Sequence, residues 1–337
     1  MRENIKEYSL KALKEKMLTL NLEAYRGEQV FKWLWQKDAD DFTVMTNLSK
    51  ELRKLFAGIF FIPELKILKV LSAEDGSKKF LFQLEDNEKI EAVFIPEAKR
   101  KTVCVSTQVG CPLQCRFCAT ALMGFIRNLE AYEIAEQIRL IQKQIKEKIT
   151  NIVFMGMGEP LLNFENLIAA IEITSSPLAL GISQRHTTIS TAGLTDGIRR
   201  LLNSPYKVKL AISLNFPDQK QRSKMMPINK KFPLSEILPL AKDYSIKKNM
   251  VTFEYVLIDK INDRIKDAQK LLDLLKGIPS KINLIPYNPH PRLPYKRPTP
   301  EKIDKFHQYL LRSHHTVTMR KSRGQKILAG CGQLALS

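Results

Sequence analysis

The sequence lacks any long apolar run and has few cysteines, and both features narrow the class of protein. No stretch of about 18 uncharged apolar residues occurs, which argues against a membrane-spanning helix. The N-terminal segment is charged throughout and lacks the apolar core of a secretory signal. Only five of the 337 residues are cysteine, and an odd number argues against a structural disulfide framework. We therefore expect a cytoplasmic protein with no membrane association.

Acidic residues are scarce relative to basic ones. The chain has 35 Asp and Glu against 54 Lys and Arg, which gives a net charge of +19. Such an excess favours a polyanionic partner, because neutralising phosphates releases counterions and drives association. Charge alone leaves open the alternative of an ordinary solvated surface, so the placement of the charges matters more than their sum.

The chain divides into three parts by pattern. Residues 1–62 are predicted to form a helical accessory domain, because apolar residues recur there at helical spacing. Residues 63–98 contain short β-rich runs separated by turns and predict a small β meander. Residues 99–337 alternate strand-like runs with helical patterns six or seven times. This alternation predicts an α/β fold, a partial (β/α) barrel whose ligand lies at the carboxyl ends of the strands.

Three cysteines follow the first strand predicted for the barrel. Cys111, Cys115 and Cys118 have C-x₃-C-x₂-C spacing, which lets three thiolates hold a [4Fe–4S] cluster and leaves one iron without a protein ligand. That iron can chelate the amino and carboxylate groups of S-adenosylmethionine, whose reductive cleavage yields a 5′-deoxyadenosyl radical. The alternative is a zinc site, but structural zinc usually requires four ligands, and no second pair or nearby histidine is present.

This spacing resembles the signature of the radical S-adenosylmethionine superfamily. The segment Gly156-Met157-Gly158-Glu159-Pro160 follows the second predicted strand, as a glycine-rich segment does in that superfamily. The resemblance implies that Gly158 and Glu159 receive the methionine end of S-adenosylmethionine. Taken alone, GMGEP is also typical of a turn that ends a strand.

Residues 85–335 resemble one family within that superfamily, the dual-specificity ribosomal and transfer RNA adenine-C2 methyltransferases. The matching stretches occur in order: IEAVFIP, CVSTQVGCPLQCRFCAT, NIVFMGMGEPLLN, TISTAG, LAISL, MPINKK, KINLIPYNP and CGQL. The resemblance implies methylation of a specific adenosine in 23S rRNA and in tRNA, with two molecules of S-adenosylmethionine consumed per turnover. It also implies an electron donor such as flavodoxin with its reductase, and we expect a monomer.

The two remaining cysteines suit this chemistry. Adenine C2 is electron-poor and cannot attack a sulfonium methyl group, whereas a thiolate can. In the family mechanism a cysteine corresponding to Cys331 accepts a methyl group, and that methyl group, converted to a radical, adds to C2. The resemblance assigns Cys104 to resolve the resulting adduct through a disulfide with Cys331, and Glu91 to accept the C2 proton.

The same residues have simpler interpretations without the family. Cys331 would be a stray thiol in the tail, although Gly330 and Gly332 beside it suggest a mobile loop. Cys104 would be a small buried strand residue. Glu91 would be a solvent-facing residue of a strand.

Further positions match family contacts to S-adenosylmethionine, and three depart from the family pattern. The matches are Ser190, Ser213 and Asn288, and we assign Leu214 and Asn215, which follow Ser213, to the same binding site. By themselves, Ser190 and Ser213 would be hydroxyls that cap the next helix. Asn215 stands where the family has histidine, and asparagine cannot act as a base near neutral pH. The other two departures are Gly330 in place of alanine and the segment 324–327, which lacks its usual acidic residue.

Basic residues gather before Cys331, where they would attract a folded RNA through its phosphates. They are Arg292, Lys296, Arg297, Arg320, Lys321, Arg323 and Lys326. Trp33 and Trp35 are expected to anchor the core of the N-terminal helices rather than stack on bases. The target adenine is expected to leave its stack in order to reach the barrel.

Three alternatives remain open. A related group of enzymes methylates C8 of adenine in ribosomal RNA and shares the cysteines. A radical enzyme that acts on protein or a small molecule would not need Cys331. A non-catalytic RNA-binding protein would hold zinc at the three-cysteine loop.

Overall fold

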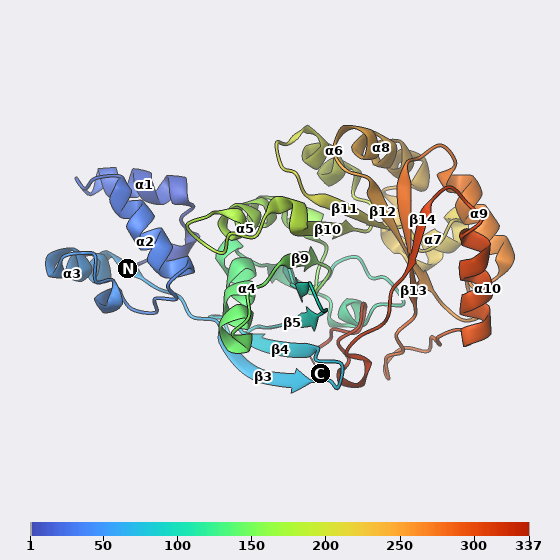
Figure 1. The fold of residues 1–337 in the computed structure, drawn as a ribbon, viewed down its shortest axis with the longest axis horizontal. Coiled ribbons are helices and arrows are strands. Elements are labelled where there is room, and N and C mark those ends of the chain that lie inside the picture. The colour runs from blue at the N-terminus through green and yellow to red at the C-terminus, as the bar shows by residue number, and fades with distance from the viewer. Residues whose placement is uncertain (1, 337) are drawn as a thin grey trace.

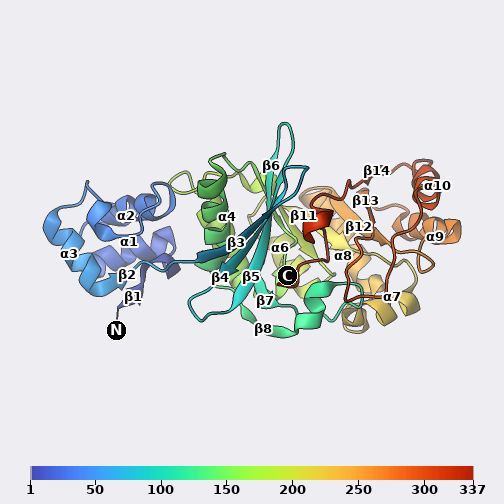
Figure 2. The ribbon, with the colours of Figure 1, turned by 90° about the horizontal axis from the view of Figure 1, so that it is seen from below.

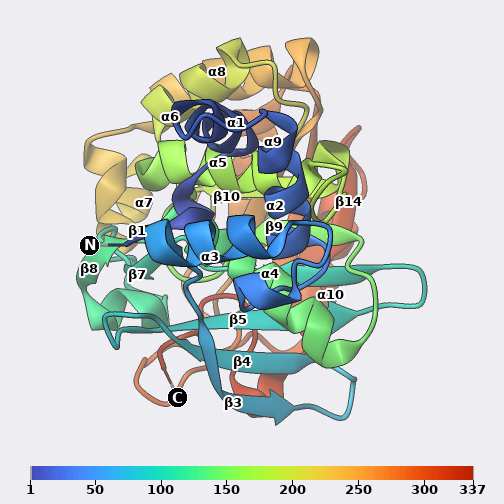
Figure 3. The same ribbon diagram turned by 90° about the vertical axis from the view of Figure 1, so that its left-hand side faces the viewer.

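The computed structural model describes residues 2–336. At one end of the molecule lie three helices, α1 (Leu10–Thr19), α2 (Tyr25–Trp35) and α3 (Lys50–Ile59) (Figures 1 and 3). Two of them begin at serines, Ser9 and Ser49, whose hydroxyl oxygens accept backbone N–H groups of the first turn. Two short strands that the sequence did not predict, β1 (Glu3–Asn4) and β2 (Phe60–Phe61), pair in parallel and join the ends of this region.

One ten-stranded sheet forms the rest of the scaffold, in the order β14-β13-β12-β11-β10-β9-β6-β5-β4-β3. Within this sheet, neighbouring strands pair in parallel from β6 through β9 to β14, and they pair antiparallel from β3 to β6. The meander expected at 63–98 therefore extends the barrel sheet. The bounds are β3 (Lys66–Ser72), β4 (Lys78–Gln83), β5 (Lys89–Pro96), β6 (Lys101–Cys104), β9 (Asn151–Phe154), β10 (Thr187–Thr191), β11 (Lys209–Ser213), β12 (Val251–Leu257), β13 (Ser280–Pro286) and β14 (Thr316–Met319).

Helices follow the parallel strands and lie outside the curved sheet, as a partial β/α barrel requires (Figures 1 and 2). The bounds are α4 (Ala131–Ile145), α5 (Phe164–Ser175), α6 (Thr195–Asn203), α7 (Gln219–Met225), α8 (Leu234–Lys247), α9 (Ile265–Leu275) and α10 (Pro300–Leu310). Neither α5 nor α7 was predicted from the sequence. A two-stranded hairpin, β7 (Gln108–Gly110) and β8 (Phe125–Asn128), lies beside the sheet and was also not predicted.

The sheet does not close into a barrel by strand pairing. The turn between β3 and β4 instead contacts the segment that follows β14. The Asp75 carboxylate accepts the Gly324 N–H at 2.9 Å, and the Arg323 guanidinium donates to the carbonyl oxygens of Asp75 and Pro96. An exposed ion pair between Lys326 and Glu74 adds to the contact. The two edges of the sheet are thus joined by a loop.

A buried ion network attaches the N-terminal helices to the barrel. Lys6 Nζ lies 3.0 Å from Glu136 Oε1 on α4, and both side chains are almost fully buried. Arg139 Nε contacts the same carboxylate at 2.6 Å, and Arg139 Nη1 reaches Asp38. Burial opposes ionisation of Glu136, but Lys6 and Arg139 outweigh it and lower the pKa of this carboxyl.

Across residues 2–336, none of the helices has the length and apolar character needed to cross a membrane.

Candidate active site

The three-cysteine loop is held by the β7–β8 hairpin rather than directly by the first barrel strand. The first barrel strand, β6, ends at Cys104, and the chain then turns into β7. At the end of β7, Gly110 has φ +74° and approaches Gly124 so closely that a Cβ atom would lie 2.0 Å from the Gly124 carbonyl oxygen. That carbonyl accepts the Cys111 N–H at 2.7 Å. Only glycine fits this close approach, which starts the loop in its observed direction.

Cys111, Cys115 and Cys118 face one pocket, which we call the cysteine pocket. The carboxyl ends of β9, β10 and β11 form its opposite wall, as the parallel-sheet prediction required. Predicted site residues on this wall are Gly158, Glu159, Ser190, Ser213 and Asn215, and Cys331 reaches the pocket from the C-terminal segment. Residues far apart in the sequence therefore meet at one place.

The three thiols suit a cluster better than a single metal ion. Among residues 2–336, no three His, Cys, Asp or Glu side chains converge closely enough to hold one ion. Zinc needs sulfur ligands at about 2.3 Å, whereas a cluster binds its thiolates at separate irons. Burial, with a smaller contribution from the neighbouring Cys118, raises the pKa of Cys111 to about 12. Such thiols would ionise on binding iron, because the iron cations of a cluster stabilise the thiolate form.

Arg222 on α7 lies behind the loop and was missed in the sequence. Its side chain is fully buried and donates to the carbonyl oxygens of Leu214, Ala192 and Ser213 at 3.0, 2.6 and 3.1 Å. No ion pair within residues 2–336 involves it, and burial lowers the pKa of its guanidinium to about 10, a shift that Cys115 opposes. A buried cation without a carboxylate partner fits a site that would hold an anionic cluster. A lone arginine in a short polar helix gives no sequence signal of this role.

Glu159 is a buried carboxylate with no cationic partner among the described residues. Its two oxygens accept backbone N–H groups of Leu161 at 3.2 Å and Ala192 at 2.8 Å. Burial raises the pKa of Glu159 to about 7, although these hydrogen bonds lower it in part. A cation placed in the cysteine pocket would stabilise the ionised form, and the amino group of S-adenosylmethionine fits this requirement.

The other predicted contacts are placed differently. Asn215 adopts φ +56°, its Oδ1 accepts the Val256 N–H at 3.0 Å, and its Nδ2 contacts the Met226 sulfur. Asn therefore holds β11 to β12 here as well as lining the pocket. The Leu214 side chain is buried and does not line the pocket.

Ser190 and Ser213 do not cap helices, so that alternative is wrong. Ser190 lies inside β10, and the hydroxyl that accepts N–H groups after this strand belongs to Thr191. The next cap along the chain that uses a side chain is Asp218, before α7. Both serines instead line the cysteine pocket.

Cys331 lies where the cysteine pocket meets a second cavity inside the sheet, which we call the barrel hollow. Cys104 and Asn288 line the barrel hollow but not the cysteine pocket, whereas Cys331 lines both. Burial raises the pKa values of Cys104, to about 12, and of Cys331, while Arg320 opposes both shifts. The structure thus brings the two non-cluster cysteines into one cavity. Both are free thiols.

The loop around Cys331 is closely packed. A Cβ atom on Gly330 would lie 2.6 Å from Asn288 Nδ2 and 2.8 Å from Gln333 Oε1. Asn288 Nδ2 also contacts the Cys331 carbonyl oxygen at 3.4 Å. The expected mobile loop is therefore fixed here by its neighbours, and Gly330 serves a close approach that alanine would disturb.

Glu91 is not solvent-facing, so the interpretation made without the family is wrong. Its side chain is fully buried on β5, with Oε1 2.9 Å from Lys79 Nζ. Its Oε2 accepts the N–H groups of Ala335 at 3.0 Å and Leu336 at 3.2 Å. The burial arises because the C-terminal segment covers β5, which local strand alternation cannot reveal. Glu91 lines neither the cysteine pocket nor the barrel hollow.

Positive charge in the barrel hollow comes only partly from the basic residues that the sequence places before Cys331. Arg320, Lys321 and Arg323 line it, and the strands add Lys209 and Lys281. Arg292, Lys296, Arg297 and Lys326 do not line it. Glu254, an isolated carboxylate within the apolar strand β12, lines both cavities and could have been noticed from that contrast.

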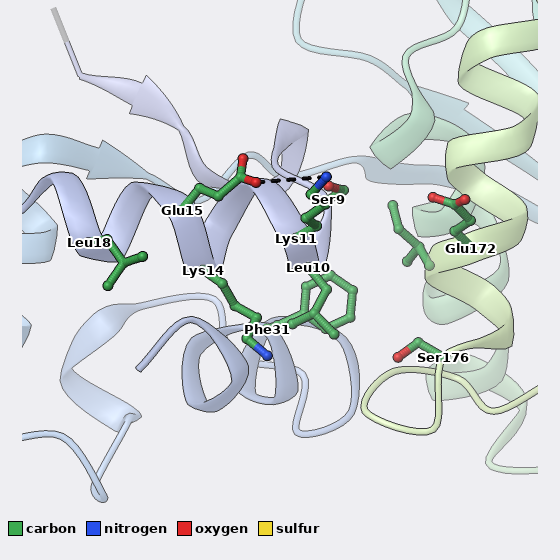
Figure 4. A pocket seen from close by; sticks show the side chains of 10 residues that line it. Ser9, Leu10, Lys11, Lys14, Glu15, Leu18, Phe31, Glu172 and Ser176 are labelled. Carbon is green, nitrogen blue, oxygen red and sulfur yellow. Dashed lines mark ion pairs between the residues drawn. The ribbon is translucent and has the colours of Figure 1, made fainter. Parts of the chain in front are cut away.

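A separate hollow lies between α1, α2 and α5 (Figure 4). Its lining includes Leu10, Leu18 and Phe31 and no cysteine or histidine, so it offers no comparable chemistry. Trp35 is buried in the core nearby, as predicted, whereas Trp33 is partly exposed beside Lys37.

Comparison with known proteins identifies the family. The profile of the radical SAM superfamily matches residues 105–275, and that of the ribosomal RNA large subunit methyltransferase N-terminal domain matches residues 3–62. A dual-specificity RNA methyltransferase RlmN from Geotalea uraniireducens is 42% identical over 332 residues, covering 98% of this chain and 96% of that protein. The chain belongs to the RlmN family. A probable RlmN from Thermotoga sp. strain RQ2 is 44% identical over 335 residues, covering 99% and 97%.

A solved structure extends the match to three dimensions. The crystal structure of a radical SAM methyltransferase from Sphaerobacter thermophilus aligns with a TM-score of 0.93 and 38% identity, covering 98% of this chain and 99% of that one. The RlmN-family chain described here therefore shares its fold over nearly its whole length. Radical SAM membership implies S-adenosylmethionine and a [4Fe–4S] cluster, and the donors in the cysteine pocket fit both.

Proposed function

We propose that this protein methylates C2 of a specific adenosine in 23S rRNA and in tRNA, with two S-adenosylmethionine molecules used per turnover. The observation that carries the proposal is the position of Cys331, between the cysteine pocket and the barrel hollow that also contains Cys104. When bound, the cluster and S-adenosylmethionine would supply a 5′-deoxyadenosyl radical. Cys111, Cys115 and Cys118 would hold the cluster.

Each remaining residue has a proposed role. Cys331 would accept and present the methyl group, and Cys104 would release the product by forming a disulfide with Cys331. Glu91 would accept the C2 proton, a role that rests on the family resemblance. Gly158, Glu159, Ser190, Ser213 and Asn215, which line the cysteine pocket, would position S-adenosylmethionine. For Leu214 and Asn288, which do not line this pocket, the same role rests on the family resemblance alone.

The basic barrel hollow supports an RNA substrate, because Arg320, Lys321 and Arg323 would meet phosphates close to Cys331. We further propose that the protein works in the cytoplasm as a monomer, with a division into accessory domain, β extension and barrel near residues 62 and 98. Flavodoxin with its reductase is the proposed electron donor.

Nucleoside analysis of RNA tests the reaction. RNA from cells with and without this protein is digested and analysed by mass spectrometry, and 2-methyladenosine is expected only where the protein is present. Appearance of 8-methyladenosine instead would assign the protein to the C8 group. Zinc in place of about four irons per chain after anaerobic purification would support a non-catalytic RNA-binding protein.

Glu159→Gln is expected to weaken S-adenosylmethionine binding about 10- to 100-fold, because a buried hydrogen bond to a charged group contributes about 1.5–3 kcal/mol. Binding is measured by equilibrium dialysis with cluster-loaded protein. Glu165→Gln makes the same chemical change at an exposed position on α5 and is expected to bind normally. Equal affinities for the two variants would remove Glu159 from the proposed site.

A further inference from the structure

An exposed basic surface lies directly outside the three-cysteine loop. Four cations surround a shallow hollow at α7, and we call them the α7 basic surface: Arg116, Lys220, Lys224 and Lys230. All four are exposed, and no ion pair within the described chain, residues 2–336, involves any of them. The nearby carboxylate, Asp218, is already engaged by Lys270 and by the Gln221 N–H. This surface therefore presents uncompensated positive charge to solvent.

The α7 basic surface is physically connected to the cluster loop. Arg116 lies between Cys115 and Cys118, and its N–H donates to the Met225 carbonyl oxygen at 2.9 Å. The opposite face of α7 buries Arg222 and Met225, and Arg222 is an electrostatic neighbour of Cys115. One helix, about 10 Å across, thus separates Lys220 and Lys224 from the cysteine pocket.

This surface lies at the other end of the barrel from the hollow that contains Cys104. In Figure 2, α7 and β8 run along the lower edge, whereas β14 and the turn between β5 and β6 lie along the upper edge. Figure 3 separates the same elements to the left and right. Glu97 and Arg100 of that turn, with Lys321 after β14, line the barrel hollow. An RNA held at the hollow would leave the α7 basic surface free.

We propose that the α7 basic surface is the docking site of an acidic one-electron carrier protein that reduces the cluster. The inference rests on the proposed function, because it needs a cluster that must be reduced. One electron leaves the reduced carrier, which becomes oxidised by one electron, and the cluster gains that electron. Complementary charge accelerates encounter and fixes orientation, and only a thin layer of protein then separates the carrier from the cluster ligands.

Lys220→Glu/Lys224→Glu tests the docking site with oxidised flavodoxin as the probe. Titration of cluster-loaded protein, followed by flavin fluorescence, is expected to show a Kd raised at least tenfold. The affinity of the unaltered protein is expected to fall as salt increases, with a smaller salt dependence in the variant. Lys242→Glu/Lys247→Glu makes the same charge change at exposed positions of α8 and is expected to bind like the unaltered protein.

A chemical reductant separates this inference from the proposed function. With dithionite in place of flavodoxin, the α7 variant is expected to methylate RNA at an unchanged rate and with an unchanged KM for RNA. A raised KM for RNA under dithionite would mean that the surface binds nucleic acid, and would overturn the proposal. Equal Kd values for the α7 and α8 variants would also overturn it. Failure of the unaltered protein to methylate RNA with dithionite would instead contradict the proposed function.

Discussion

Cys331→Ala is expected to abolish RNA methylation, with a loss of at least about 10³-fold, because alanine leaves no nucleophile to accept the methyl group. Binding of the cluster and of S-adenosylmethionine in the cysteine pocket is expected to survive, since the cluster ligands come from another loop. The variant is therefore expected to bind iron and S-adenosylmethionine normally while producing no methylated adenosine. Mass spectrometry of digested RNA measures the product, and iron analysis shows that the site is intact.

Cys104→Ala is the matched control, because it removes a thiol from the same cavity. If Cys104 releases the product, its loss is expected to leave RNA attached to the protein, visible as a shifted band on a denaturing gel. Cys331→Ala is expected to show no such band. Full RNA methylation by the Cys331 variant would exclude Cys331 as the methyl acceptor. An absence of attached RNA with full turnover in the Cys104 variant would exclude the resolving role of Cys104.

Glu136→Gln is expected to lower the free energy of unfolding by about 3–5 kcal/mol, because it leaves Lys6 buried without its charged partner. Lys6 then retains the Pro63 carbonyl oxygen as an acceptor, at 3.3 Å. Arg139 still reaches Asp38. Urea denaturation followed by tryptophan fluorescence suits the measurement, because Lys6 Nζ lies 5.7 Å from the centre of the Trp35 ring.

Glu15→Gln provides the comparison for this stability change. Glu15 pairs with Lys11 at 3.9 Å on the surface of α1, where both side chains remain mostly exposed. Exposed pairs contribute little, so this variant is expected to unfold at nearly the urea concentration of the unaltered protein. Similar destabilisation by the two substitutions would contradict the view that the Lys6–Glu136 pair attaches the N-terminal helices to the barrel.

Much of the fold was predictable from the sequence because its signals are local. Serines before α1 and α3, and the alternation of apolar strands with amphipathic helices, act over a few residues. The misses have physical reasons. The sequence of α5 is apolar on most faces and shows little periodicity, whereas α7 is short and polar and is held by the contacts of Arg222.

The candidate site was predictable where residue type alone indicates chemistry. Cysteine spacing and GMGEP led to the cysteine pocket, which the structure assembles from several strand ends. The environment of Glu91 could not be predicted, because the groups that bury it come from a segment about 244 residues away in the chain. Arg222 could not be predicted either, since its meaning depends on the carbonyl groups that surround it.

The loop that joins the two edges of the sheet has a dynamic consequence. A barrel closed by strand pairing can widen only by breaking a ladder of backbone hydrogen bonds, whereas here β3 and β14 are linked through Asp75, Arg323, Gly324 and an exposed ion pair. Opening this seam leaves every strand pair intact. Amide hydrogens of residues 321–329 are therefore expected to exchange with solvent far faster than those of β12 and β13, so that the barrel opens locally without unfolding.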